Sequence, residues 1–321
     1  MKPSETYSTK QAEQLLPLPK GTKAVISTLL YYGVFNFPLT LAEIMDNTNY
    51  KWQSENELKQ TLNILVSLGM ISMHDGYFFP FNKHQLVTNR LTITKNTEPY
   101  YTKAQKYSRI ISYFPFVVGV LITGSLSKGC IAKDGDIDYL IITKPGRLWL
   151  CRGLLVFYKK LFLFNSRKYF CVNYYVDSES LTIPDHNIFT ATEVISAMPT
   201  YNRQICANFI TDNNWLTNYY PNKKVNTQLC VDELNTDKIK LYSEKLLDGI
   251  VGEKLDKLFM RLFIWRWKQK FKGSDISRFE VNFRSRKNVS KHHPNGFQFI
   301  VLDAYNKSIA EFEANYNIKL I

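Results

Sequence analysis

The segment from Val120 to Thr143 constrains the fold of this chain more than any other part of the sequence. Two apolar runs with the composition of buried strands enclose Gly124-Ser125 and, after ten further residues, the pair Asp136 and Asp138. Side chains at positions i and i+2 of a strand share a face, so we expect the two carboxylates to lie close together and to point the same way. Two like charges at that separation repel each other, and a site that keeps both often holds a cation.

The same segment has the residues that a metal ion and a phosphate group need. Mg²⁺ in proteins is usually bound by one or two carboxylates together with substrate phosphates, which fits Asp136 and Asp138. Gly124 and Ser125 leave the first strand and open a short helix, where glycine permits close backbone approach and free N–H groups bind phosphate. Lys128, one turn further on, adds a positive charge. A D-x-D pair or a Gly-Ser turn alone is common, whereas the combination indicates a metal–nucleotide site.

The regions around this segment predict a chain of several parts. Capping boxes at Thr40 and Ser54 and an Asp75-Gly76 turn predict three helices followed by a hairpin, which is the element order of a winged helix-turn-helix. Strands then alternate with a helix, as is typical of an α/β (α+β) fold with a mixed sheet. The expected parts are a flexible arm (1–20), a winged-helix-like domain (21–95), an α/β core (96–200) and a helical C-terminal region (201–321).

Gly124-Ser125 with Asp136-Ile-Asp138 resembles the signature of the DNA polymerase β-like nucleotidyltransferase superfamily, over roughly residues 115–180. The whole layout resembles uncharacterised bacterial nucleotidyltransferase-domain proteins with an N-terminal winged helix. The resemblance implies that residues 96–200 form a nucleotidyltransferase core, which moves a nucleoside monophosphate from an NTP to an acceptor and releases pyrophosphate. It implies two Mg²⁺ ions on Asp136 and Asp138, and β- and γ-phosphates cradled by Gly124 and Ser125, with ATP as the expected donor. The acceptor stays open between a nucleic acid such as tRNA, a protein side chain and a small molecule.

One departure from the superfamily pattern concerns the third carboxylate, which the family usually places on a following core strand. The mid-strand position of the strand that ends at Asp177 is Asn173, which brings no charge and cannot act as a base. Asn173 can still ligate a metal through its carbonyl oxygen. Asp177 lies four residues further and is the candidate to replace the missing carboxylate as a catalytic residue. The alternative function is a catalytically weakened nucleotide-binding or DNA-binding regulatory protein.

The net charge of +13 is unevenly distributed along the chain. Residues 1–95 contain nine Lys and Arg against seven Asp and Glu, a net of +2. Phosphate neutralisation supplies most of non-specific DNA affinity, so the winged-helix-like domain is better explained as a packing or dimerisation module than as a DNA reader.

The stretch from Arg261 to Lys291 contains ten Lys and Arg against two Asp and Glu, a net of +8. Basic residues interleaved with Trp265, Trp267 and Phe271 are typical of contact with single-stranded nucleic acid. The expected contacts are Arg261, Arg266, Lys268 and Lys270. The alternative is a solvated helix whose aromatic side chains pack on the domain, because Leu255, Leu258, Leu262 and Trp265 recur at helical spacing and predict a core face.

The remaining sequence features bear on the compartment. The five cysteines are widely spaced and form no C-x-x-C, so neither a disulfide framework nor a structural zinc site is expected. The N-terminus has no apolar signal region, and no apolar stretch reaches the ~18 residues of a membrane span. The sequence therefore predicts a cytoplasmic protein with no membrane partner.

Overall fold

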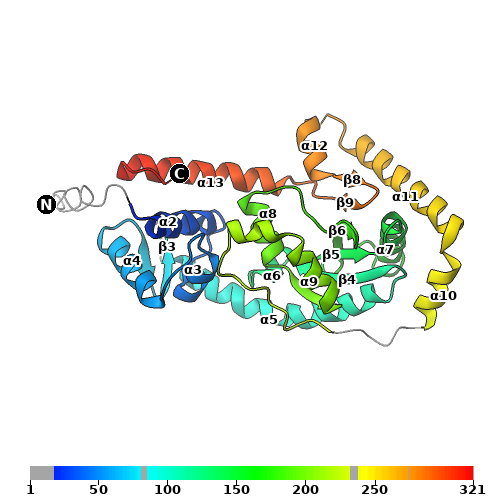
Figure 1. The fold of residues 1–321 in the computed structure, drawn as a ribbon, viewed down its shortest axis with the longest axis horizontal. Coiled ribbons are helices and arrows are strands. Elements are labelled where there is room, and N and C mark those ends of the chain that lie inside the picture. The colour runs from blue at the N-terminus through cyan, green and yellow to red at the C-terminus, as the bar shows by residue number, and fades with distance from the viewer. Residues whose placement is uncertain (1–17, 81–84, 232–237, 274, 321) are drawn as a thin grey trace.

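The computed structural model describes residues 18–80, 85–231, 238–273 and 275–320. The chain has a mixed α/β fold built on a six-stranded sheet of order β7-β4-β5-β6-β9-β8 (Figure 1). Its strands are β4 (Val117–Thr123), β5 (Asp138–Thr143), β6 (Cys171–Asp177), β7 (Met198–Tyr201), β8 (Ser285–Arg286) and β9 (Val289–Lys291). β5 and β6 pair in parallel and the other neighbours are antiparallel, so the sheet is mixed, as the sequence predicts.

Residues 18–80 form a smaller unit, which we call the N-terminal module. It contains α2 (Lys20–Gly33), β1 (Leu39–Thr40), α3 (Leu41–Asn47), α4 (Glu55–Ser67), β2 (Ser72–His74) and β3 (Tyr77–Phe79). The capping box at Thr40 is formed in full with Glu43, and the Ser54 side chain accepts a hydrogen bond from the Glu57 backbone N–H. β2 and β3 form the expected hairpin across Asp75.

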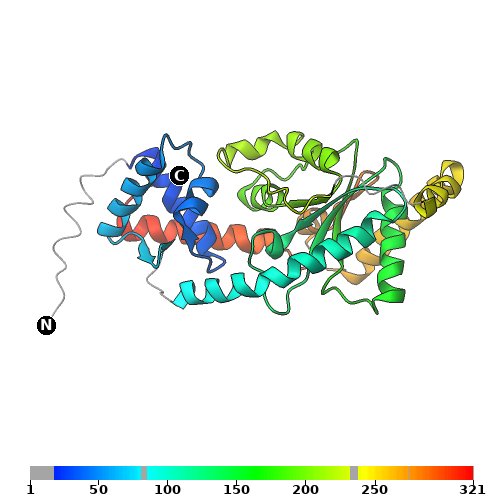
Figure 2. The same ribbon diagram turned by 90° about the horizontal axis from the view of Figure 1, so that it is seen from below.

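The two faces of the central sheet are covered by different helices, because strand residues alternate between faces. Tyr139 and Ile141 face α5 (Gln85–Ser112), α7 (Leu148–Phe162) and α11 (Gly249–Lys270), and α5 also reaches along the sheet from the N-terminal module (Figure 2). Leu140 and Ile142 pack with α8 (Ile188–Ile195), α9 (Arg203–Thr211) and the 3₁₀ helix η1 (Asn214–Asn218).

The remaining helices are α6 (Gly124–Ser127), α10 (Lys238–Leu246), α12 (Ile276–Asn282) and α13 (Phe297–Tyr316). α13 returns to the N-terminal module and lies along α2 (Figure 1), where Val301, Tyr305, Ile309 and Phe312 join the core of that module. The Tyr305 ring meets Tyr31 edge-on at 5.4 Å. The C-terminal end of the chain therefore completes the hydrophobic core of the N-terminal end.

The expected domain boundaries differ from the observed packing. The boundary at 95/96 falls inside α5, and the boundary at 200/201 falls inside β7. The C-terminal region is not only helical, since β8 and β9 extend the central sheet. Most of the expected arm lies outside the described residues, but Leu18 is buried and α2 begins at Lys20. The five cysteines are free thiols, and in the described ranges no helix is long and apolar enough to cross a membrane.

Candidate functional site

Gly124 and Asp138 touch at the point where β4 ends and β5 begins. β4 and β5 are antiparallel with Thr123 opposite Asp138, which brings the start of α6 onto the carboxylate. Gly124 has φ of +69°, and a Cβ added there would lie 2.4 Å from Oδ2 of Asp138. Only glycine combines this left-handed backbone with so close an approach. The sequence-predicted turn and the D-x-D pair are thus parts of one site.

Asp138 is held in a setting that disfavours its negative charge. The amide of Asn173 donates a hydrogen bond to Oδ1 of Asp138 at 2.9 Å. The pKa of Asp138 is raised to about 6, mainly by burial and also by the nearby charges of Glu193 and Asp136, against a hydrogen bond from Cys171 and the charge of Lys128. A bound cation would stabilise the charged form of Asp138 against both the burial and the repulsion that raise this pKa.

Asp136 precedes β5 by two residues and shares the surroundings of Asp138, whose pKa its charge raises. The donor set is therefore two carboxylates and the amide oxygen of Asn173, which are hard oxygen ligands suited to Mg²⁺. Glycine at position 124 lets the backbone approach Oδ2 of Asp138 more closely than any residue with a Cβ could. These residues fit a Mg²⁺–phosphate group, although no preformed cluster of three His, Cys, Asp or Glu side chains exists among the described residues.

Lys128 lies in the site but is already bound within the protein. Its Nζ donates to the Gly124 carbonyl and to Oε1 of Glu193, both at 2.8 Å. The half-buried Glu193 comes from α8, on the far side of the turn. We did not predict a site role for Glu193, because the sequence does not indicate that a side chain of α8 reaches Lys128. Ser125 lies next to Gly124 in α6, as expected, and its carbonyl accepts the backbone N–H of Cys130.

Asp177 does not belong to the site, which corrects the catalytic role predicted for it. In the parallel β5–β6 pair, Asp138 is opposite Cys171, whereas Asp177 is opposite Thr143 at the other end of the strands. At ~3.3 Å per residue, the two carboxylates are roughly 17 Å apart along the sheet. Oδ1 of Asp177 accepts the backbone N–H of Glu179, as a turn residue does. The position beside Asp138 is filled by Asn173.

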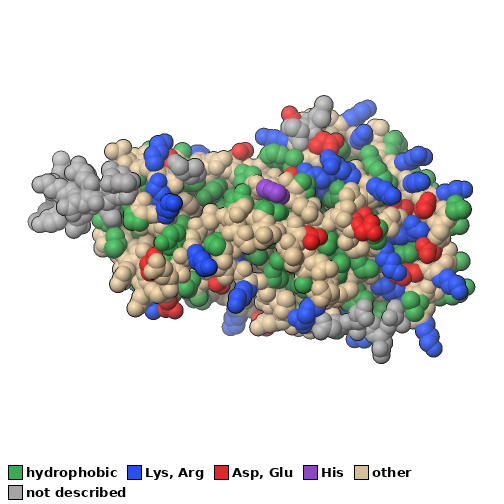
Figure 3. Space-filling model, in the orientation of Figure 1, with side chains coloured by type: hydrophobic (Ala, Val, Ile, Leu, Met, Phe, Trp, Pro, Cys, Tyr) green, Lys and Arg blue, Asp and Glu red, His purple; other side chains and the backbone are tan. Residues whose placement is uncertain are grey.

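The C-terminal basic stretch is only partly available to a ligand. Lys291 is buried and Arg284 is largely buried against Asp185, with the Arg284 contact at 2.7 Å, so two of the ten cations are paired within the protein. Arg261, Arg266, Lys268 and Lys270 are exposed on α11, at the end of the molecule where Lys and Arg side chains gather (Figure 3).

The prediction of which face of α11 packs on the core is wrong. Leu258, Leu262 and Trp265 are 50%, 49% and 62% exposed, whereas Trp267 is buried against Trp149 and Phe263. Two faces of α11 carry apolar residues. The prediction followed the leucine spacing, which marks the exposed face, whereas the buried face contains Trp267.

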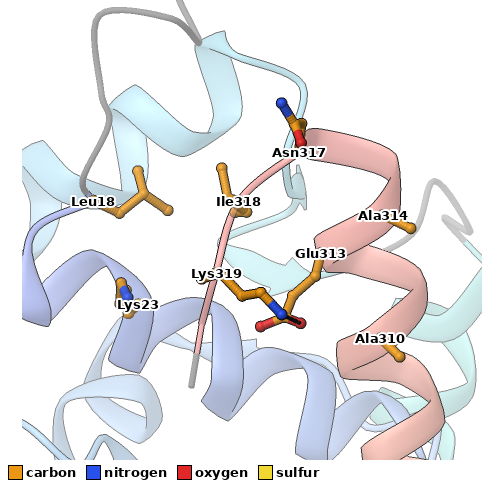
Figure 4. Close-up of a pocket in the computed structure, with 8 residues that line it drawn as sticks. All are labelled: Leu18, Lys23, Ala310, Glu313, Ala314, Asn317, Ile318 and Lys319. Carbon is orange, nitrogen blue, oxygen red and sulfur yellow. Dashed lines mark ion pairs between the residues drawn. The ribbon is translucent and has the colours of Figure 1, made fainter.

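A pocket of about 460 Å³ lies away from the candidate site, between α2 and the end of α13 (Figure 4). Glu313 and Lys319 point toward each other across it and form an ion pair at 3.7 Å. The carboxylate of Glu313 is already paired with Lys319, and we assign the pocket no role. A scan against protein-family models and searches of curated proteins and of solved structures find no match to this chain.

Proposed function

We propose that this protein is a Mg²⁺-dependent nucleotidyltransferase, which moves a nucleoside monophosphate from an NTP, with ATP as the expected donor, to an acceptor and releases pyrophosphate. The observation that supports the proposal is the contact between Gly124 and Asp138. Position 124 requires glycine for two reasons: its φ is +69°, and a Cβ there would lie 2.4 Å from Oδ2 of Asp138. A purely structural D-x-D would have no need of a side-chain-free turn at its carboxylate.

In this proposal each residue of the site has a separate task. Asp136 and Asp138 hold the ions, which when bound neutralise the triphosphate and lower the pKa of the acceptor hydroxyl. Gly124 and Ser125 lie against the β- and γ-phosphates with their backbone. Asn173 fixes the orientation of Asp138 through its 2.9 Å hydrogen bond. Lys128, whose Nζ contacts Oε1 of Glu193, would supply a positive charge to the phosphate oxygens of the donor.

A nucleotide-binding regulatory protein without turnover is the second candidate, and Asn173 is the observation that favours it. An amide replaces the carboxylate beside Asp138 and donates a hydrogen bond to it, so it cannot accept the proton of an acceptor hydroxyl. Such a protein would bind Mg²⁺ and NTP but transfer nothing.

Label transfer separates the two candidates. The protein is incubated with Mg²⁺ and each α-labelled NTP, with total protein, tRNA or a small-molecule extract as the acceptor. Transfer that is abolished in Asp136→Asn and Asp138→Asn supports the enzyme. Asp134→Asn is the matched control, because Asp134 is an exposed carboxylate two residues away. NTP binding with no labelled product from any acceptor supports the regulatory protein.

We also propose that the N-terminal module is a winged helix-turn-helix that serves packing rather than DNA binding. Lys59, the one basic residue of α4, is paired with Glu55 at 2.6 Å. Affinity for random duplex DNA is measured across a range of salt concentrations. We expect the affinity to be low and to change little with salt concentration. A steep fall of affinity with salt would show phosphate contacts and contradict this assignment.

A further inference from the structure

Helix α10 turns charged residues toward the protein and apolar residues outward. Lys240 and Glu244 are buried, and both bind backbone groups near the start of β4: Nζ of Lys240 donates to two carbonyls, and Glu244 accepts one N–H. Tyr242 and Leu246 lie one turn apart and are 72% and 66% exposed. An ordinary surface helix buries its apolar stripe, so α10 has the reverse arrangement.

Helix α11 also carries an apolar stripe on its outer side. Its members follow one another at spacings of seven, four and three residues, which places them on one face of the helix: Val251, Leu258, Leu262 and Trp265. They are 57%, 50%, 49% and 62% exposed, whereas Trp267 on another face is buried against α7. We call these four residues, together with Tyr242 and Leu246, the outer face of α10–α11.

The two helices form one end of the molecule. Figure 1 and Figure 2 both show α10 and α11 at the end opposite the N-terminal module, where they project beyond the central sheet. Single exposed apolar residues are ordinary on a protein surface and need no explanation. The outer face is different, because its six residues follow one another along two consecutive helices. Such a surface indicates contact with a partner.

The charge around the outer face is strongly positive. Residues 238–270 have eight exposed Lys and Arg against two exposed Asp and Glu, a net of +6. Lys254, Arg261 and Lys268 recur every seven residues, so they line one side of the apolar stripe of α11. The partner that fits is therefore apolar and negatively charged. A second copy of the chain does not fit, because it would place two faces of net +6 against each other.

The aliphatic side chains distinguish between two kinds of polyanion, a nucleic acid and an anionic lipid surface. Bases stack on aromatic rings, so a nucleic acid would use Tyr242 and Trp265 and leave the four aliphatic residues in water. A membrane interface takes up aliphatic side chains at the acyl boundary, holds Trp and Tyr at the level of the headgroups, and attracts Lys and Arg to anionic lipids. Every kind of residue on the outer face therefore has a favourable place on a lipid surface.

We propose that the outer face of α10–α11 binds peripherally to membranes that contain anionic lipids. Its apolar residues enter the acyl boundary, and the flanking Lys and Arg contact the headgroups. The expectation of no membrane partner considers only signal regions and spanning stretches. The finding that no described helix can cross a membrane likewise does not bear on helices that lie in the plane of its surface. The proposal does not depend on the proposed function.

Vesicle flotation of the full chain tests the proposal, with vesicles of phosphatidylcholine alone or mixed with phosphatidylserine. We expect the wild type to float with the mixed vesicles, and less so as NaCl is raised. Two double variants are each expected to bind at least about tenfold more weakly, Leu246→Gln with Leu258→Gln and Arg261→Gln with Lys268→Gln. Ile64→Gln is the matched control, because Ile64 is 47% exposed on α4 at the other end of the molecule.

Trp265 reports the contact directly. Its fluorescence emission is expected to shift to shorter wavelength when mixed vesicles are added, and Trp265→Phe, which keeps an apolar ring, is expected to lose this shift but still to float. Urea denaturation should give the charge variant the stability of the wild type, since both side chains are exposed. Wild-type protein that does not float with mixed vesicles overturns the proposal, including the case in which the outer face binds a single-stranded oligonucleotide or a second copy instead. Flotation that is unchanged in both double variants also overturns it.

Discussion

At the scale of single residues, the carboxylate of Asp138 is unfavourable for the stability of the fold but suited to binding a cation. Its carboxylate is largely buried, close to Asp136 and Glu193, and contacts a turn that only glycine can form. The protein keeps a carboxylate there although burial and like charges outweigh the hydrogen bonds and the Lys128 charge that stabilise it. This is the pattern expected when a site is built for a cation rather than for the free energy of folding.

Asp138→Asn is therefore expected to stabilise the metal-free protein. The amide keeps the shape and can still accept the hydrogen bond from Asn173, but it removes a carboxylate whose pKa is raised to about 6. At pH 7.5 in EDTA, the free energy of unfolding should rise by about 1–3 kcal/mol, measured by urea denaturation. A variant that is less stable than the wild type would show that the carboxylate has a structural partner.

The sequence predicted the parts of this site that depend on short-range geometry. The Gly124 turn and the Asp136–Asp138 spacing are local, and the structure brings them together. Asp177 was misplaced because its face was predicted without its strand register, which puts it opposite Thr143. The role of Glu193 could not be predicted, since it depends on a contact between α8 and Lys128 that is distant in sequence.

At the scale of elements, two largely buried ion pairs of Asp185 hold the β8–β9 hairpin in place. Asp185 precedes α8 and binds Arg284 through both carboxylate oxygens, at 2.7 and 3.0 Å, with Lys291 at 3.5 Å. Burial raises the pKa of Asp185, but the hydrogen bonds from Arg284 and the charge of Lys291 outweigh it, so the pKa is lower than usual. The pair thus links the loop before α8 to the outer edge of the sheet.

Asp185→Asn is expected to destabilise the protein by about 3 kcal/mol at pH 7, because two buried cations lose their partner. A depressed carboxyl pKa stabilises the folded state above the ordinary aspartate value of about 3.9, and this contribution is lost as the pH falls through the lower pKa of the folded protein. The difference between variant and wild type, followed by denaturation from pH 7 to pH 3, should therefore shrink below about pH 4. A difference that does not change with pH would contradict the ion-pair explanation.

The two tryptophans of α11 test which of its faces is buried. Trp267 is 5% exposed and Trp265 is 62% exposed. Trp267→Ala is expected to lower the free energy of unfolding by about 3–5 kcal/mol, and Trp265→Ala to change it by no more than about 0.5 kcal/mol. Equal effects in chemical denaturation would mean that the leucine-rich face packs on something in solution.

At the scale of the whole molecule, the two ends of the chain share one core. The sequence predicted the elements of the N-terminal module, since capping boxes and turn residues are local signals. It could not show that α13 supplies Tyr305 and Phe312 to that module, because the contact spans almost the entire chain. A division of the sequence into consecutive domains cannot describe a core that is shared by the two ends of the chain.

Phe312→Ala is expected to loosen the N-terminal module before the central sheet. The side chain is 3% exposed in the core that α13 shares with α2, and its loss should cost about 3–5 kcal/mol. Limited proteolysis with mass spectrometry should then find the first cleavages within residues 18–80. Glu311→Ala, at an exposed position of the same helix, should keep the wild-type pattern. First cleavages inside the central sheet would contradict the shared core.

The most direct test of the central claim, that Gly124, Asp136 and Asp138 form one metal–triphosphate site, is calorimetric binding of an NTP whose α,β-bridging oxygen is replaced by methylene. This analogue cannot transfer its nucleotide, so the unidentified acceptor does not matter. We predict binding that requires Mg²⁺, is unchanged in Asp134→Asn, and is at least about tenfold weaker in Asp138→Asn and Gly124→Ala, where the new Cβ displaces the carboxylate. Equal affinity with Mg²⁺ and with EDTA, or equal affinity in all four proteins, would contradict the claim.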